Sequence, residues 1–153
     1  MSPGGATMSE STRRAVVVLG VLTLLGGIAG IVYSAGQSFT APRGARVGEL
    51  MHLNPLGSWV SIGLGVLTVV AGWRRSITLA FVAVAGFAAC VVAVTLGANR
   101  DVNPLGGTAS TVGFHLGPGV GVLALALAER AASRATAADL EPRSSDDPEH
   151  QRS

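Results

Sequence analysis

The sequence predicts an all-α protein, an integral membrane four-helix bundle. Charged residues make up 13% of the 153 residues and apolar residues 48%, whereas a soluble domain carries about 25% charged residues. Four stretches are uncharged, or nearly so, over lengths that cross a hydrocarbon layer as helices. The motif Asn-Pro-Leu-Gly occurs twice, each time ahead of one of these stretches. Together these observations predict four spans in two related halves.

The first span is predicted at about residues 15–35, directly after Arg13 and Arg14. Residues 1–14 are rich in Ser and Gly and are expected to form a disordered cytoplasmic N-terminus. Paired arginines before an apolar stretch also occur in cleaved export signals. This stretch is longer than the usual signal core of 7–15 residues, and its length favours a retained span.

A polar connection, residues 37–53, follows the first span. Within it, Val47, Leu50 and Met51 have helical spacing, which indicates a short interfacial helix. The second span is predicted at 56–73. Trp59 and Trp73 stand near its two ends, where aromatic residues meet the membrane interface.

The third span is predicted at 76–97 and the fourth at 111–128, joined by a second polar connection. The character of the chain changes at residue 129, where acidic, basic, Ser and Pro residues return. Residues 129–153 are therefore expected to form a disordered cytoplasmic tail, with an extension of the fourth helix to about Ala138.

Arginine counting predicts the orientation. With four spans, six arginines lie close to the membrane on one side and three on the other. By the positive-inside rule both termini are cytoplasmic, and the absence of Lys suggests a GC-rich bacterial genome, hence a bacterial inner-membrane location. The basic residues stand beside the spans rather than in a patch, which argues against a nucleic-acid partner. The six arginines on the cytoplasmic side are Arg13, Arg14, Arg74, Arg75, Arg130 and Arg134, and the three on the opposite side are Arg43, Arg46 and Arg100.

An internal repeat predicts a tandem duplication of a helical hairpin. The stretch beginning at Gly63 matches the one beginning at Gly119, and both end at an arginine. Small residues spaced four apart share one helix face and let helices approach closely in lipid. Chance similarity between Gly-rich apolar segments is the alternative. The predicted helix-packing residues are Gly26 and Gly30 in the first span, Gly57, Ser61 and Gly65 in the second, and Gly113, Gly117 and Gly121 in the fourth.

The four short spans, with Asn54-Pro55-Leu56 opening the second, resemble a family of small actinobacterial membrane proteins of unknown function. The resemblance covers Ala15 to Ala128. Members of that family typically carry Asn-Pro-Leu-His-Asn at this point, followed by a His. Here Gly57 and Ser58 replace His-Asn, Ser61 lies near the second His, and the resemblance implies that His115 corresponds to a histidine of the last span. The resemblance implies a fold but no activity.

Three polar residues are candidates for a site near the outer face: His115, Asn54 and Asn103. His115 is the only His, Asp, Glu, Lys or Arg within the predicted spans, where such residues often bind ligands or relay protons. The alternative is a neutral histidine that hydrogen-bonds a nearby carbonyl. Asn54 and Asn103 each precede Pro, a pattern typical of helix caps. A binding site for a headgroup or cation at the two asparagines is the second interpretation.

The sequence contains no recognisable catalytic set and no cofactor or metal motif, so it predicts a protein that is not an enzyme. The expected function is a helix-packing or assembly module in contact with the lipid bilayer, with a homo-oligomer or a larger membrane protein as partner. The alternative is a binding or transport protein for a small molecule, lipid or ion, with its site near the outer face.

Overall fold

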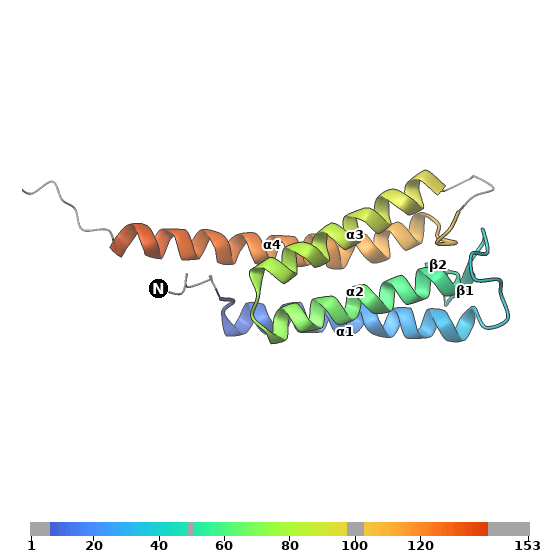
Figure 1. Cartoon of the computed structure of the whole chain (residues 1–153), viewed down its shortest axis with the longest axis horizontal. Helices are drawn as coiled ribbons and strands as arrows, with labels where there is room; N and C mark the ends of the chain where they lie inside the picture. The colour runs from blue at the N-terminus through green and yellow to red at the C-terminus, as the bar shows by residue number, and fades with distance from the viewer. Residues whose placement is uncertain (1–6, 49–50, 98–102, 141–153) are drawn as a thin grey trace, which may run out of the picture.

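Four long helices form the protein in a computed structural model that describes residues 7–48, 51–97 and 103–140. They are α1 (Glu10–Tyr33), α2 (Pro55–Trp73), α3 (Ile77–Gly97) and α4 (Ala109–Leu140), with a two-stranded antiparallel sheet of β1 (Ala45–Val47) and β2 (Met51–Leu53) between α1 and α2 (Figure 1). Each helix is long and apolar enough to cross a membrane. The predicted all-α membrane fold is confirmed.

The helices pair as two hairpins. The most extensive packing is between α1 and α2, followed by that between α3 and α4, and the two pairs lie side by side in Figure 1. One end of the bundle holds the sheet and the start of α4, and we call it the loop end. The other holds the start of α1, the α2–α3 turn and the protruding half of α4, and we call it the arginine end. This pairing agrees with two tandem hairpins, while duplication itself stays a prediction.

Side-chain caps begin three of the helices. Ser9 caps α1 by accepting from the Thr12 N–H, and Asn54 caps α2 by accepting from the Gly57 N–H. The Ser76 hydroxyl oxygen accepts from the Leu79 N–H, 3.2 Å away, at the start of α3. Such caps satisfy backbone donors that a helix start leaves without an intrahelical partner.

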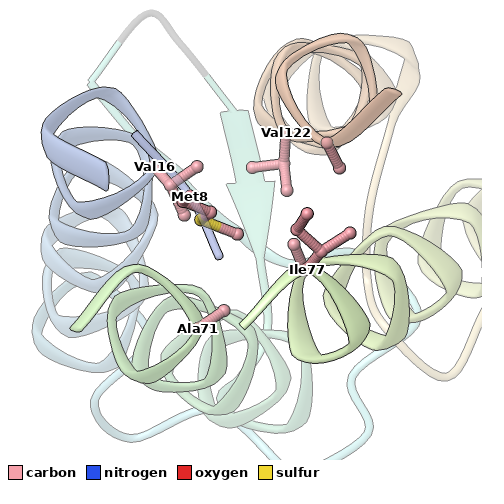
Figure 2. Close-up of a cluster of buried hydrophobic side chains, with 7 residues drawn as sticks. Met8, Val16, Ala71, Ile77 and Val122 are labelled. Carbon is pink, nitrogen blue, oxygen red and sulfur yellow. The ribbon is translucent and has the colours of Figure 1, made fainter. Parts of the chain in front are cut away.

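Part of the predicted disordered N-terminus is ordered. Met8 is 2% exposed and packs with Val16, Ala71, Ile77 and Val122 in the core at the arginine end (Figure 2). The Met8 N–H also donates to the Arg75 carbonyl at 3.3 Å. The expectation of disorder over 1–14 is therefore wrong for residues 7–14, because burial of Met8 fixes the chain ahead of α1. Residues 1–6 lie outside the described residues.

Residues 129–140 continue α4, so disorder does not begin at residue 129 and the expected extension of the fourth helix is observed. The physical reason is their composition: alanine, the best helix former, recurs through this segment. The expected extension to about Ala138 agrees with the observed end at Leu140. Residues 141–153 lie outside the described residues.

The short interfacial helix predicted around Val47 and Met51 is wrong, since these residues pair in a β-hairpin. Val47 lies opposite Met51, and Gly48 has φ +57°, which a turn requires and an α-helix excludes. Val47, Met51 and Leu53 are buried beside Phe114 of α4. The apolar residues therefore follow the period of a strand, and Leu50 lies outside the described residues.

Candidate functional site

The two Asn-Pro-Leu-Gly motifs lie against each other at the loop end. The Asn54 side chain is fully buried, and its Nδ2 donates to the carbonyls of Pro104 at 2.7 Å and of Ala41 at 3.0 Å. Its Oδ1 accepts from the Gly57 N–H at 2.7 Å. Asn54 thus caps α2 and at the same time ties the first loop to the second motif.

The second motif is a turn rather than a helix start. The Gly106 N–H donates to the Asn103 carbonyl at 3.0 Å, and Gly106 has φ +61°, the left-handed region that favours glycine. Helix α4 begins only at Ala109, after Thr108, whose carbonyl accepts from the Thr111 N–H at 2.9 Å. The expectation that Asn103 caps a helix is therefore wrong. Gly107 and Thr108 separate this motif from α4, and the Leu105 carbonyl of the motif lies over Gly57 at the start of α2.

Asn103 is 7% exposed and contributes one side-chain hydrogen bond, from its Nδ2 to the Gly107 carbonyl at 2.8 Å. Its Oδ1 is buried and has no hydrogen-bond partner among the residues that the structure describes. The side-chain hydrogen bonds of Asn54 and of Asn103 thus all go to backbone groups. Each holds backbone in the interlocked motifs.

His115 joins α4 to α2 in the interior. It is 2% exposed, its Nδ1 lies 2.9 Å from the Thr111 carbonyl, and its Nε2 lies 3.0 Å from the Ser61 Oγ. The Phe114 ring meets the imidazole edge-on, with centroids 5.2 Å apart. Both ring nitrogens are thus used inside the protein.

The hydrogen bonds around His115 constrain where protons can lie. A carbonyl only accepts, so Nδ1 carries the proton that bonds Thr111. The single Ser61 hydroxyl hydrogen has two acceptors within reach, Nε2 and the Gly57 carbonyl at 2.9 Å. It points to Nε2 when the ring is neutral and to Gly57 when Nε2 is also protonated. Ser61 can thus serve Nε2 as a donor or as an acceptor through one hydroxyl rotation.

Thr111 continues these contacts towards the sheet. Its Oγ1 donates to the His52 carbonyl at 2.7 Å and accepts from the His52 N–H at 3.2 Å. Thr111 therefore links the ring of His115 to the backbone of His52, so the connection between the two histidines is indirect. No group of three His, Cys, Asp or Glu residues able to hold a metal ion occurs in the described part of the chain.

An apolar groove of about 240 Å³ runs between α3 and α4. His115 is one of its lining residues, but the ring nitrogens bond Ser61 and Thr111. Such a groove takes an apolar group, for example a large side chain or an acyl chain, rather than a polar ligand. Leu116 and Val120 of α4 also line the groove.

The predicted helix-packing residues divide into two sets. In α1 and α2 they meet neighbouring elements: Gly26 lies against Phe114, Gly30 against Ser58 and Gly65 against Leu24, while Gly57 lies under the Leu105 carbonyl. Ser61 is the partner of His115. In α4, Gly121 lies against Leu19, whereas a Cβ added at Gly113 or Gly117 would meet nothing within 4 Å. The α4 ladder therefore packs within the chain at only one of its three positions.

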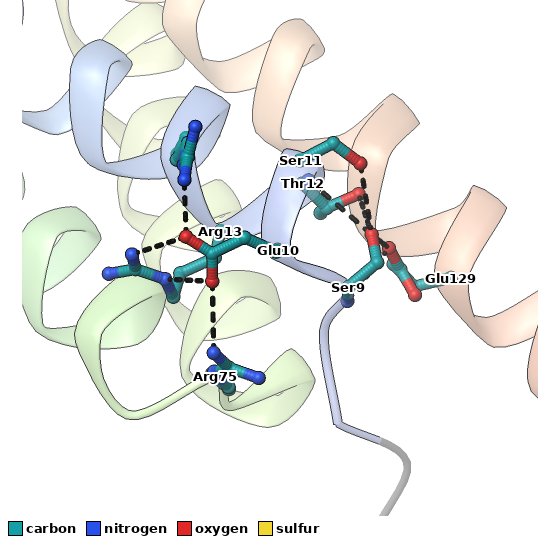
Figure 3. Close-up of polar contacts among 8 residues, drawn as sticks. Ser9, Glu10, Ser11, Thr12, Arg13, Arg75 and Glu129 are labelled. Carbon is teal, nitrogen blue, oxygen red and sulfur yellow. Dashed lines mark hydrogen bonds and ion pairs between the residues drawn. The ribbon is translucent and has the colours of Figure 1, made fainter.

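A charged cluster at the arginine end was missed in the sequence, where arginines were used only to assign orientation. Glu10 binds Arg13 at 2.7 Å and both Arg14 and Arg75 at 2.9 Å (Figure 3). Hydrogen bonds from Arg13 and Arg14 lower the pKa of Glu10, which precedes the apolar part of α1, to about 2. The i,i+3 and i,i+4 spacing was the available signal. The contact between Glu10 and Arg75, which are far apart in the sequence, becomes apparent only in the folded chain.

Glu129 forms a second polar contact at the arginine end. It accepts from the backbone N–H of Ser9 at 3.1 Å and from the Ser9 hydroxyl (Figure 3). This contact ties α4 to the start of α1. The two described acidic groups nearest the α2–α3 turn are thus both engaged.

Comparison with known proteins gives one family match. Residues 13–128 match the family model described as "Domain of unknown function (DUF4383)". This agrees with the predicted resemblance to an uncharacterised family. Neither the curated proteins nor the solved structures give a match.

Proposed function

We propose that this chain, which belongs to the DUF4383 family, is a non-catalytic assembly module of the bacterial cell membrane that associates with a second copy of itself. The observation that carries the proposal is a face of α4 with open space in front of Gly113 and Gly117, directly beside the apolar groove. We call this the α4 face. Its members are Gly113, Leu116, Gly117 and Val120.

The α4 face has the two properties that association in lipid requires. Small residues four apart allow a second backbone to approach closely, and Gly113 and Gly117 have this spacing. Leu116 and Val120 are 49% and 55% exposed and border the groove. A large side chain of an approaching helix can therefore enter the groove while its backbone lies on the glycines.

The polar interior supports a structural role over a binding or transport role. Asn54 uses its amide in the interlocked motifs, and His115 uses both nitrogens on Ser61 and Thr111. A soluble ligand at the outer face would have to compete with these bonds. The binding or transport function indicated by the sequence thus has less support than assembly.

Leucine at Gly117 is expected to weaken self-association about tenfold, equivalent to ~1.4 kcal/mol. The added side chain fills the space that a second helix needs, while the fold has room for it. Association of the full chain in nanodiscs or vesicles, followed by single-molecule photobleaching, measures the effect. Gly63→Leu on α2 is the matched control, because that position is equally open. Equal association of Gly117→Leu and the unmodified chain would contradict the proposal, and copurification of a larger membrane protein would replace the second copy as partner.

Both termini are proposed to be cytoplasmic, because the arginine end carries six arginines against three in the connections at the loop end. In a chain whose single cysteine is replaced (Cys90→Ala), Thr136→Cys is expected to react with an impermeant maleimide only after cell lysis. Ser38→Cys is expected to react in intact cells. Both positions are exposed. The reverse labelling pattern would invert the orientation and the assignment of the loop end to the outer face.

A further inference from the structure

A second cavity, of about 400 Å³, lies beside the α2–α3 turn at the arginine end. Three arginines line it: Arg74 and Arg75 from the turn and Arg130 from α4. The cavity wall also includes the hydroxyl-bearing residues Ser76 and Thr78 and the aromatic residue Phe81. The proposed self-association does not involve this cavity, and none of its lining residues was predicted from the sequence to form a binding site.

The positive charge in the cavity is only partly compensated. The Arg74 guanidinium has no hydrogen-bond or ion-pair partner among the described residues, and Arg130 lies over the Phe81 ring at 6.0 Å rather than on a carboxylate. Arg75 bonds Glu10 at 2.9 Å, but that carboxylate also binds Arg13 and Arg14. Glu129, next to Arg130, accepts from Ser9. Local anions thus leave net positive charge facing the cavity.

The start of α3 adds to this field. The cavity wall includes Ser76, Ile77 and Thr78, where α3 begins, and a helix N-terminus carries a partial positive charge that favours anions. Arginine binds phosphate oxygens through paired N–H donors, and hydroxyl groups add single donors. The combination of arginines, hydroxyls and a helix start therefore suits a phosphate group, whose several oxygens can accept hydrogen bonds from these donors.

Because α2 and α3 are each long and apolar enough to cross a membrane, the turn between them is expected at the depth of the lipid headgroups. The cavity is formed where α2 ends and α3 begins, beside Trp73, which is 76% exposed and is of the residue type enriched at membrane interfaces. Phe81, one turn into α3, supplies an apolar floor. We propose that this cavity binds a phosphate group, either the headgroup phosphate of an anionic phospholipid or free phosphate. The proposal does not depend on self-association.

The test compares the full chain with Arg74→Gln/Arg130→Gln. The charge-matched control is Arg43→Gln/Arg134→Gln, whose residues lie outside the cavity lining. Each protein is purified in mild detergent and titrated with phosphatidylglycerol or phosphatidylcholine, with retained lipid counted by native mass spectrometry. In a second arm, inorganic phosphate is compared with chloride at equal ionic strength, and thermal unfolding is the readout. The cavity variant is expected to bind phosphatidylglycerol at least ~10-fold more weakly, as for the loss of a charge-assisted hydrogen bond.

The lipid and phosphate arms of the experiment distinguish a lipid headgroup from free phosphate as the ligand. Preference for phosphatidylglycerol that the cavity variant loses and the control keeps supports the site with lipid as its ligand. Stabilisation by inorganic phosphate that is lost in the same variant supports it with free phosphate as its ligand. Equal loss in cavity variant and control overturns the proposal, because the effect is then general charge, as does unchanged binding in the cavity variant. If the Gln pair fails to fold, the single variants Arg74→Gln and Arg130→Gln replace it, and undiminished binding by both overturns the proposal equally.

Discussion

Replacing Gly65 with leucine is expected to force α1 away from α2 and to lower the free energy of unfolding by about 3 kcal/mol. A Cβ at this position would lie 2.6 Å from the Leu24 nitrogen, a backbone atom of α1 that a side-chain rotation cannot move. The helices would have to separate along their most extensive contact. Thermal unfolding in detergent, or unfolding by added SDS in mixed micelles, measures the loss.

Gly63→Leu is the matched control for Gly65→Leu. It places the same side chain two residues away on the same helix, where a Cβ meets nothing within 4 Å. Its stability is expected to stay within about 0.5 kcal/mol of the unmodified chain, as for ordinary surface changes. If the two variants lost stability equally, leucine at any glycine of α2 would be harmful and the α1–α2 contact would not be the cause.

This contrast changes the meaning of the predicted small-residue ladders. In the sequence, Gly65 and Gly121 occupy equivalent repeat positions, and both were expected to serve association. In the structure, Gly65 lies against the backbone of α1, whereas Gly121 meets only the end of the flexible Leu19 side chain. Repeat equivalence identifies positions on a helix, but the neighbour that each one meets depends on the packing of the other helices.

The membrane fold was readable from the sequence because its signals are local. Length and apolar composition located α2 and α3 within one residue at each end, and Asn-Pro predicted the Asn54 cap. The features that differ depend on distant partners. Met8 is ordered by Val122 and other residues far along the chain, and the hairpin at 45–53 packs on Phe114. Local spacing carries no information on such contacts.

The candidate site was predictable to a similar extent. The helical environment indicated that His115 could bond a nearby carbonyl, and Thr111 one turn earlier supplies it. Its second partner, Ser61, lies 54 residues away and becomes apparent only when α2 and α4 are placed together. The arginine cavity was hidden for the same reason, since Arg74 and Arg130 were assigned as ends of separate spans and their convergence requires the folded turn.

Replacing Asn54 with alanine is expected to cost ~3 kcal/mol of stability, about 1 for the lost helix cap and about 1 for each of two further hydrogen bonds. These two bonds join the Asn54 Nδ2 to the carbonyls of Ala41 and Pro104, at 3.0 and 2.7 Å. Asn103→Ala removes one bond, to Gly107, and is expected to cost only about 1 kcal/mol. Thermal unfolding of the two variants in one detergent gives the comparison.

Asn54→Asp separates the two roles of this side chain. Aspartate keeps the acceptor for the Gly57 N–H, and a negative charge at a helix N-terminus is favourable. It has no donor for Ala41 or Pro104, and its second oxygen would face both carbonyls in a buried setting. Destabilisation at least as large as that of Asn54→Ala therefore shows that the tie between the two motifs, rather than the cap, is what this residue stabilises. An aspartate variant as stable as the unmodified chain would reverse that conclusion and reduce the interlocked motifs to two independent turns.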